Sequence, residues 1–341
     1  MPKKNPAFTF VRLVSTLVIV YYHFAIALDE NLFPLLLPNS RSGLGFLFVS
    51  VFFILSGYLL YLRYPVIRDA GWFYRKRAAS IYPDFYTTYA IVFLYHLIKG
   101  SSVLAGKPLK TFPLTLLGLD GYLSASFDTW YLVGEWFLGA IVLLYLLYPA
   151  VLFLFRKSRI ITFLSVLCLY FLFLSKPLLS PSPLTNLFSC LVSFMAGMYL
   201  AEAGERILSG KWLFGICAGC LLVFFCIPMG IENLQADNII THVAAILVFL
   251  VLSRVGMAVT SRPKIAAPVL FMGEYCYPVF LVHHILLLKL LHLFPPARLW
   301  QAIVLLLITY ILVFAAAVLV RQLRIWLATQ ITKRKEFFKK D

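Results

Sequence analysis

The first long apolar stretch of the chain reads FVRLVSTLVIVYYHF, residues 10–24. It belongs to a run of about 20 mainly apolar residues, the length that an α-helix needs to cross the hydrocarbon core of a bilayer. Two ionisable residues, Arg12 and His23, interrupt the run. Eleven positions separate them, so on a helix they lie within roughly 20° of one face and about 16 Å apart along the axis. The stretch therefore predicts a membrane-spanning helix with a polar stripe.

The whole chain has the composition of a membrane protein. Of its 341 residues, 62% are hydrophobic and 13% are charged, and the mean hydropathy is +0.91, whereas roughly 45–50% of the residues in a soluble domain are apolar. The net charge is +16, but the charges are scattered between apolar runs. This distribution favours contact with anionic lipid headgroups. A soluble globule is excluded, and we expect no nucleic-acid partner.

Further apolar runs predict an all-α, polytopic transmembrane bundle of about ten helices. The expected spans are residues 8–28, 44–62, 83–99, 130–153, 160–175, 184–203, 212–228, 239–257, 269–293 and 299–323. No stretch between them is long enough to fold separately, and the longest, residues 100–129, is expected to form a loop or a short re-entrant element. We expect a single transmembrane domain over residues 1–324, without a cleavable leader, and a basic cytoplasmic tail over residues 325–341.

The distribution of basic residues predicts the orientation. If the N-terminus is cytoplasmic, the inner segments hold 22 of the 30 Lys and Arg residues and the outer loops hold 6. This imbalance follows the positive-inside rule, places both termini in the cytoplasm and requires an even number of spans. We expect a multi-pass protein of the cell membrane, namely a bacterial inner or plasma membrane.

Ionisable groups inside a membrane cost several kcal/mol and usually face a cavity, so they are the first candidates for function. Arg12 and His23 are two of these groups, and Glu135 and His283, the latter together with its neighbour His284, can reach the same interior. A neutral imidazole is a common general base, and Glu135 can orient an imidazole or bind a sugar hydroxyl. The alternatives are an interfacial anchor for Arg12, a hydrogen bond to a neighbouring helix for His23, and structural interhelical pairs for the others.

The stretch WFYRKRAASIYPDFY, residues 72–86, concentrates Arg75, Lys76 and Arg77 on the expected inner side, just before Pro83 opens the next span. Guanidinium groups match phosphate oxygens bidentately, so the cluster can bind a nucleotide-like carrier. Positive-inside anchoring is the alternative. The six cysteines, a C-x-x-C at Cys217 included, lie in or beside apolar stretches, so no metal site or permanently bound cofactor is expected.

Several motifs follow one another along most of the chain. They are the R-x10-H of Arg12 and His23, the run GFLFVSVFFILSGYLL ending near Ser56-Gly57-Tyr58, the basic stretch before Pro83, the segment from Trp130 to Glu135, the FMAG around Gly197, and the segment from Gly273 to His283. In this order they resemble the integral-membrane acyltransferase family 3. Members of that family O-acylate lipopolysaccharide, peptidoglycan, exopolysaccharides and some antibiotics.

The resemblance implies transfer of an acyl group, expected to be acetyl, from cytoplasmic acyl-CoA to a hydroxyl of a cell-surface or lipid-linked carbohydrate. It implies that Arg77 helps to bind the donor and that Arg12 and His23 take part in transfer. The family's R-x-x-R reads Arg77-Ala-Ala-Ser80 here, so the phosphate contact of the second arginine comes from Arg75 or Lys76 or is absent. We expect no appended hydrolase-like domain, and therefore expect transfer to finish in the membrane core or to involve another protein.

The expected site therefore has three groups of residues. Its catalytic residues are His23, Arg12 and Glu135; its donor-binding residues are Arg75, Lys76 and Arg77; and its substrate-binding residues are Trp130, Tyr277 and His283. Acyl-CoA enters as a cosubstrate, and membrane lipids and polysaccharide-assembly proteins are the expected partners. A transporter or flippase of a lipid-linked saccharide and a catalytically silent assembly partner are the rival hypotheses, because the same polar groups can line a translocation path.

Overall fold

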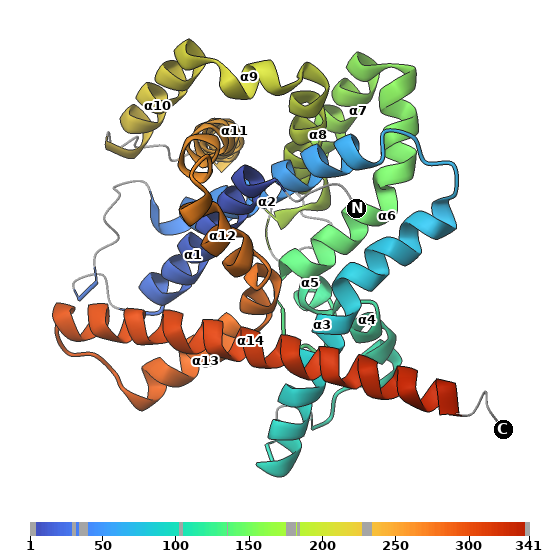
Figure 1. Ribbon diagram of the computed structural model, residues 1–341, viewed down its shortest axis with the longest axis vertical. Coiled ribbons are helices and arrows are strands. Elements are labelled where there is room, and N and C mark those ends of the chain that lie inside the picture. Colours follow the sequence, from blue (N-terminus) through green and yellow to red (C-terminus); the bar gives the residue numbers. More distant parts are fainter. Residues whose placement is uncertain are drawn as a thin grey trace.

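The computed structural model describes residues 5–28, 32–33, 40–101, 105–134, 136–174, 182, 185–226 and 234–337. All regular structure in these residues is helical, and they form no β-strand (Figure 1). The predicted all-α class is therefore confirmed.

The elements follow one another as α1 (Pro6–Ile26), α2 (Ser40–Arg63), α3 (Ala70–Ile98), η2 (Leu109–Thr111), α4 (Phe112–Leu116), α5 (Asp120–Leu123), α6 (Trp136–Lys157), α7 (Arg159–Leu174), α8 (Leu187–Ala203), α9 (Glu205–Ser209), α10 (Lys211–Cys226), α11 (Leu234–Thr260), α12 (Pro263–Gly273), α13 (Cys276–Leu293) and α14 (Leu299–Phe337). In the described residues, six of them are long and apolar enough to cross a membrane: α1, most of α2, α6, most of α11, α13 and most of α14. A helix lies at each of the ten predicted spans, but α7, α8, α10 and α12 have only 10–17 residues. Several membrane crossings are thus supported, and the count of about ten stays a prediction.

The prediction of one continuous helix over residues 269–293 is wrong. α12 ends at Gly273 and α13 begins at Cys276, so Glu274 and Tyr275 lie between the two helices. Pro278 is the third residue of α13, where its missing N–H costs no intrahelical hydrogen bond. Arg321 on α14 donates to the backbone carbonyl of Glu274 at 2.8 Å. A proline and an arginine from a distant helix together stabilise the break.

Two predicted helix starts also differ from the structure. Pro83 lies inside α3, which already begins at Ala70, so this proline does not open a helix. Its ring removes the hydrogen bond to the carbonyl of Ala79, and Ala79 is exposed, so water can replace that bond. The span predicted from residue 130 begins as a helix only at Trp136, because the residues before it belong to a separate element.

That element is a compact segment, residues 105–134, which we call the cap. It contains η2, α4 and α5. Tyr82, Tyr86 and Tyr89 on α3 donate to carbonyls of the cap, at Leu117 (3.0 Å), Leu116 (2.6 Å) and Trp130 (2.8 Å) respectively. Because three successive turns of one helix hold it, the cap lies along α3 instead of extending away from the bundle.

The closest packing in the bundle joins α2 and α8. A Cβ on Gly57 would lie 1.9 Å from the carbonyl oxygen of Phe194, and a Cβ on Gly197 would lie 1.9 Å from that of Ile54. Only glycine allows backbones to approach so closely, as in the small-residue interfaces of membrane helices. The glycines of the two sequence motifs thus serve the same contact.

α1 occupies a central position, in contact with α2, α11, α12 and α13. α14 is the longest helix and runs along one side of the molecule past α13 and α3 (Figure 1). It holds both neighbours through charges, because Arg321 pairs with Glu274 at 2.6 Å and Arg324 pairs with Asp84 at 3.2 Å. The helix continues unbroken through residues 325–337, so the expected tail begins inside it.

Candidate functional site

Three histidines from two helices meet in the bundle. The ring centroid of His23 on α1 lies 5.3 Å from that of His283 and 4.9 Å from that of His284, both on α13. His283 is fully buried, while His23 and His284 are half-buried. The predicted catalytic His23 and the predicted substrate-binding His283 are therefore neighbours. We call the three residues the histidine cluster.

The hydrogen bonding of His283 fixes its tautomer. Its Nδ1 lies 2.8 Å from the backbone carbonyl oxygen of Phe280. A carbonyl oxygen only accepts, so Nδ1 carries the hydrogen and Nε2 is the acceptor nitrogen of the neutral ring. Because adjacent imidazolium ions repel each other, the histidine cluster suits the transfer of a single proton.

Arg12 lies at the other end of the polar stripe. It is half-buried, and its guanidinium is within electrostatic range of Cys276, the first residue of α13. Thr16, one turn further along α1, donates from its hydroxyl to the backbone carbonyl of Arg12 at 2.9 Å. The two ends of the stripe are thus near the same helix, His23 in ring contact with α13 and Arg12 within electrostatic range of its first residue.

Between these two ends, α1 and α13 are packed closely. A void of about 10 Å³ lies between α1, α2 and α13, lined by Thr16, Phe52 and His283 among others. This is room for about one water molecule. The void lies along the polar stripe, because Thr16 on α1 is between Arg12 and His23.

Arg77, the predicted donor-binding residue, points into a cage of aromatic rings. Its guanidinium carbon lies 5.3 Å from the ring centroid of Tyr64, 6.0 Å from that of Phe73 and 5.7 Å from that of Tyr145. It also donates to the hydroxyl of Tyr64 at 3.2 Å. Cation–π contacts of this kind hold a guanidinium in a defined place.

The other basic residues of this cluster lie outside the cage. Arg75 and Lys76 are exposed, and the ammonium of Lys76 lies 5.6 Å from the ring centroid of Trp72. Ser80, at the position of the family's second arginine, is also exposed, and its hydroxyl donates to the carbonyl of Arg77 at 2.7 Å. Arg75 and Lys76 therefore remain accessible for phosphate contacts, whereas Ser80 bonds within its own helix.

Tyr277 lies on α13 between the aromatic cage and the histidine cluster. Its hydroxyl is buried without a hydrogen-bond partner in the part of the chain that the structure describes, and it lies within electrostatic range of Asp84 and Tyr145. Tyr145 is itself part of the cage around Arg77. The predicted substrate-binding tyrosine is therefore beside the donor-binding residues, seven positions before His284 on the same helix.

Trp130 is not brought to the histidine cluster. The indole N–H of Trp130 donates to the carbonyl of Pro108 at 3.0 Å, and its ring packs against Phe112. Both contacts lie within the cap, so the structure gives Trp130 a role in holding the cap together. Glu135 lies outside the described residues.

Sequence reasoning missed two ionisable residues that the same rule on membrane charges identifies. Asp84 is buried and paired with Arg324. His242 on α11 is buried, and its two ring nitrogens lie 2.9 and 2.8 Å from the hydroxyls of Ser189 and Ser193 on α8. His242 therefore serves as an interhelical link. His284 was a candidate beside His283 in the sequence, although it was not among the expected site residues.

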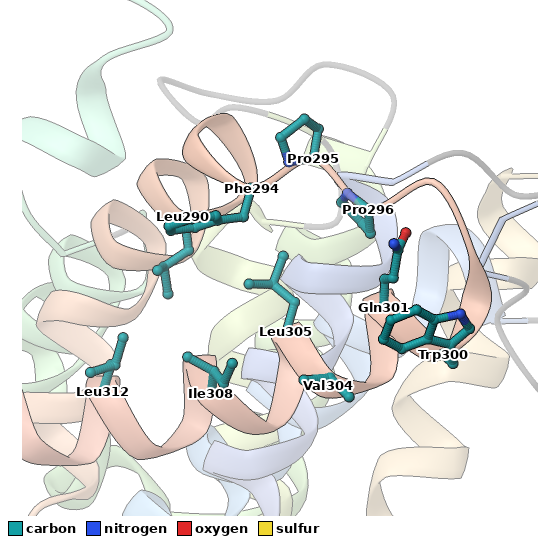
Figure 2. A pocket seen from close by; sticks show the side chains of 10 residues that line it. All are labelled: Leu290, Phe294, Pro295, Pro296, Trp300, Gln301, Val304, Leu305, Ile308 and Leu312. Carbon is teal, nitrogen blue, oxygen red and sulfur yellow. The ribbon is translucent and has the colours of Figure 1, made fainter.

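The described residues contain no group of three or more His, Cys, Asp or Glu side chains placed to hold a metal ion. An apolar groove of about 590 Å³ does lie between α13 and α14, as Figure 2 shows. Its polar side chain, Gln301, already accepts from the backbone N–H groups of Ala297 and Arg298. The groove therefore offers surface for hydrocarbon chains but no reactive group.

Comparison with known proteins identifies the class of activity. The family model described as an acyltransferase domain matches residues 5–321. The match includes both ends of the polar stripe, the aromatic cage, the cap and the histidine cluster. No curated protein and no solved structure matches the chain. Because the family match covers almost the entire chain, the protein belongs to the acyltransferase family 3 and is a membrane acyltransferase.

Proposed function

We propose that the protein is an O-acyltransferase that moves an acyl group, specifically acetyl, from cytoplasmic acyl-CoA to a hydroxyl of a cell-surface or lipid-linked carbohydrate. The observation that carries this proposal is the meeting of His23 with His283 and His284 inside a family 3 chain. Imidazole is the group best suited to take a proton from a hydroxyl near neutral pH.

The proposal places about ten spans in a bacterial inner or plasma membrane, with both termini in the cytoplasm. The excess of basic residues in the inner segments supports this orientation. The aromatic cage of Arg77 then lies at the cytoplasmic side, where acyl-CoA is present, and His23 lies further toward the outer face. The donor and the acceptor would thus approach from opposite sides.

In the proposed reaction, a ring nitrogen of His23 takes the proton of the acceptor hydroxyl, and the oxygen attacks the thioester carbonyl carbon. The C–S bond breaks, the ester C–O bond forms, and the proton passes to the leaving thiolate. Arg12 and Glu135 would support this step, and Tyr277, His283 and Trp130 would contact the substrates. An acyl-histidine formed at His23 is an alternative route with the same overall balance.

The test is acyl transfer by the purified protein in lipid nanodiscs, with labelled acetyl-CoA and a glycan acceptor. We expect His23→Ala to lower transfer by roughly 100-fold or more, the contribution typical of a general base. His292→Ala is the matched control, because His292 is exposed near the end of α13, and it should transfer at the wild-type rate.

The outcomes separate the rival functions. A transporter or flippase predicts neither acyl-CoA binding nor transfer, and a silent assembly partner predicts no turnover by the wild-type protein. Wild-type transfer that persists unchanged in His23→Ala would support an acyltransferase but contradict the assignment of the base.

A further inference from the structure

A hollow of about 300 Å³ lies next to the donor-binding cluster, at the turn between α2 and α3. Its lining includes the aromatic side chains Tyr64, Trp72 and Phe73, together with Arg68 and Asp69. Trp72 is 45% exposed, whereas Tyr64 and Phe73 are buried beneath it. The hollow therefore presents one accessible flat ring on a rigid aromatic floor.

The aromatic floor is fixed by contacts between its rings. The ring centroid of Tyr64 lies 5.9 Å from that of Trp72 and 5.4 Å from that of Phe73, both in edge-to-face geometry. Such pairs hold rings in defined orientations. Trp72 is thus positioned before any ligand arrives, which reduces the entropy lost on binding.

The charges around the hollow suit an anion. Arg68 lines it, Lys76 lies over Trp72, and Arg63 lies 5.5 Å from the ring centroid of Tyr64. The carboxylate of Asp69 also lines it, but its Oδ1 accepts from the backbone N–H of Trp72 at 3.0 Å and caps α3. The acidic group is engaged in the fold, and the exposed cations remain available to phosphate oxygens.

We propose that this hollow binds the purine nucleotide end of the acyl donor, with the base stacked on Trp72 and the phosphates facing Arg68 and Lys76. The inference rests on the proposed function, since it assigns a place to part of that donor. Arg77, the next residue after Lys76, points inward to the cage shared with Tyr145. The acyl-bearing arm of the donor would leave the hollow in that direction.

An anionic lipid headgroup shares the phosphate chemistry and is the competing occupant. A headgroup needs cations but gains nothing from a flat ring, whereas a base gains roughly 1–3 kcal/mol from stacking on an aromatic side chain. The combination of an exposed tryptophan, a preformed floor and surrounding cations therefore favours the nucleotide.

The experiment measures binding of adenosine 3′,5′-bisphosphate to the full-length protein in nanodiscs of zwitterionic lipid. Trp72→Ala should weaken binding about tenfold or more, and Trp72→Phe should retain most of the affinity. Trp212→Ala is the matched control, because Trp212 is 90% exposed beside Lys211 and lies outside the hollow; its affinity should equal that of the wild type.

Inorganic pyrophosphate has no base, so its binding reports on the phosphate contacts alone and distinguishes them from stacking on Trp72. Trp72→Ala should leave pyrophosphate binding unchanged, while Arg68→Gln should weaken pyrophosphate and the bisphosphate alike. Equal bisphosphate affinity of the wild type and Trp72→Ala would overturn the proposal. So would displacement of the bisphosphate by anionic lipid with no dependence on Trp72, which would assign the hollow to a headgroup.

The acyl-transfer assay distinguishes this failure from failure of the proposed function. If wild-type protein transfers the acyl group but shows no Trp72-dependent nucleotide binding, the hollow is wrongly assigned and the acyltransferase remains. If wild-type protein neither binds acyl-CoA nor transfers the group, the proposed function itself is wrong.

Discussion

The contact between α2 and α8 makes a quantitative prediction for Gly57→Ala and Gly197→Ala. Each new Cβ would lie 1.9 Å from a backbone carbonyl oxygen, whereas ordinary van der Waals contact begins at 3.4 Å. The two helices must therefore separate by about 1.5 Å at this point. Side-chain rotation cannot relieve the clash, because backbone atoms form both sides of it.

Separating α2 from α8 should lower the free energy of unfolding, because it loosens the packing of fully buried side chains. Phe53, Ile54, Tyr58, Phe194 and Met198 are all 0% exposed. Overpacking of a close contact costs about 1–3 kcal/mol, and the absence of any flexible neighbour places these variants near 3 kcal/mol. For a chain of this size, that corresponds to a fall of roughly 5 °C in melting temperature.

The assay is the melting temperature of purified protein in detergent, followed by the fraction that stays monodisperse after heating. Gly219→Ala on α10 is the matched control, because its Cβ would meet nothing within 4 Å, and we expect no loss of stability. The double variant of Gly57 and Gly197 should lose less stability than the sum of the two single variants, since one separation of α2 from α8 accommodates both methyl groups. Additive costs, or single variants as stable as the control, would refute the close backbone contact.

Three further predictions concern polar groups. Burial raises the pKa of Asp120 in the cap from 3.8 to about 6, so the stability that its protonated form contributes is complete below about pH 4 and is lost as the pH rises through 6. Asp120→Asn should therefore be more stable than wild type by roughly 3 kcal/mol at pH 7 and equally stable at pH 4, which melting curves across this pH range would show. Tyr277→Phe should keep or slightly raise the melting temperature, because the hydroxyl has no partner in the described residues, but should lower acyl transfer about tenfold if that hydroxyl contacts a substrate. Arg321→Met should lower the melting temperature by leaving Glu274 without its ion partner, and adding Glu274→Gln should restore part of the loss; a double variant no more stable than the single one would contradict the pairing.

The sequence predicts those features that depend on local periodicity. The helical class follows from long apolar runs, and the common face of Arg12 and His23 follows from their eleven-residue spacing. That His23 contacts α13 does not follow, because periodicity defines a stripe and not the helix that packs against it. The proximity of His23 to His283 and His284 is a tertiary fact of this kind.

The features that could not be predicted arise where distant segments determine local structure. The break before α13 depends on Arg321, which lies 47 residues from Glu274 in the sequence. The cap depends on three tyrosines of α3 that bond to carbonyls 30 to 41 residues away. For Asp84 and His242 the sequence did carry the signal, since each is an ionisable residue inside or beside a predicted span, the same property that identified His23.

The most direct test of the central claim compares base-hydrolysable acyl groups on surface glycans in cells that produce wild-type protein or His23→Ala. The proposed function predicts that the acyl groups present with wild-type protein disappear with His23→Ala, while His292→Ala keeps them at wild-type level and all three proteins are equally abundant in the membrane. Undiminished glycan acylation by His23→Ala would contradict the role of the histidine cluster in transfer.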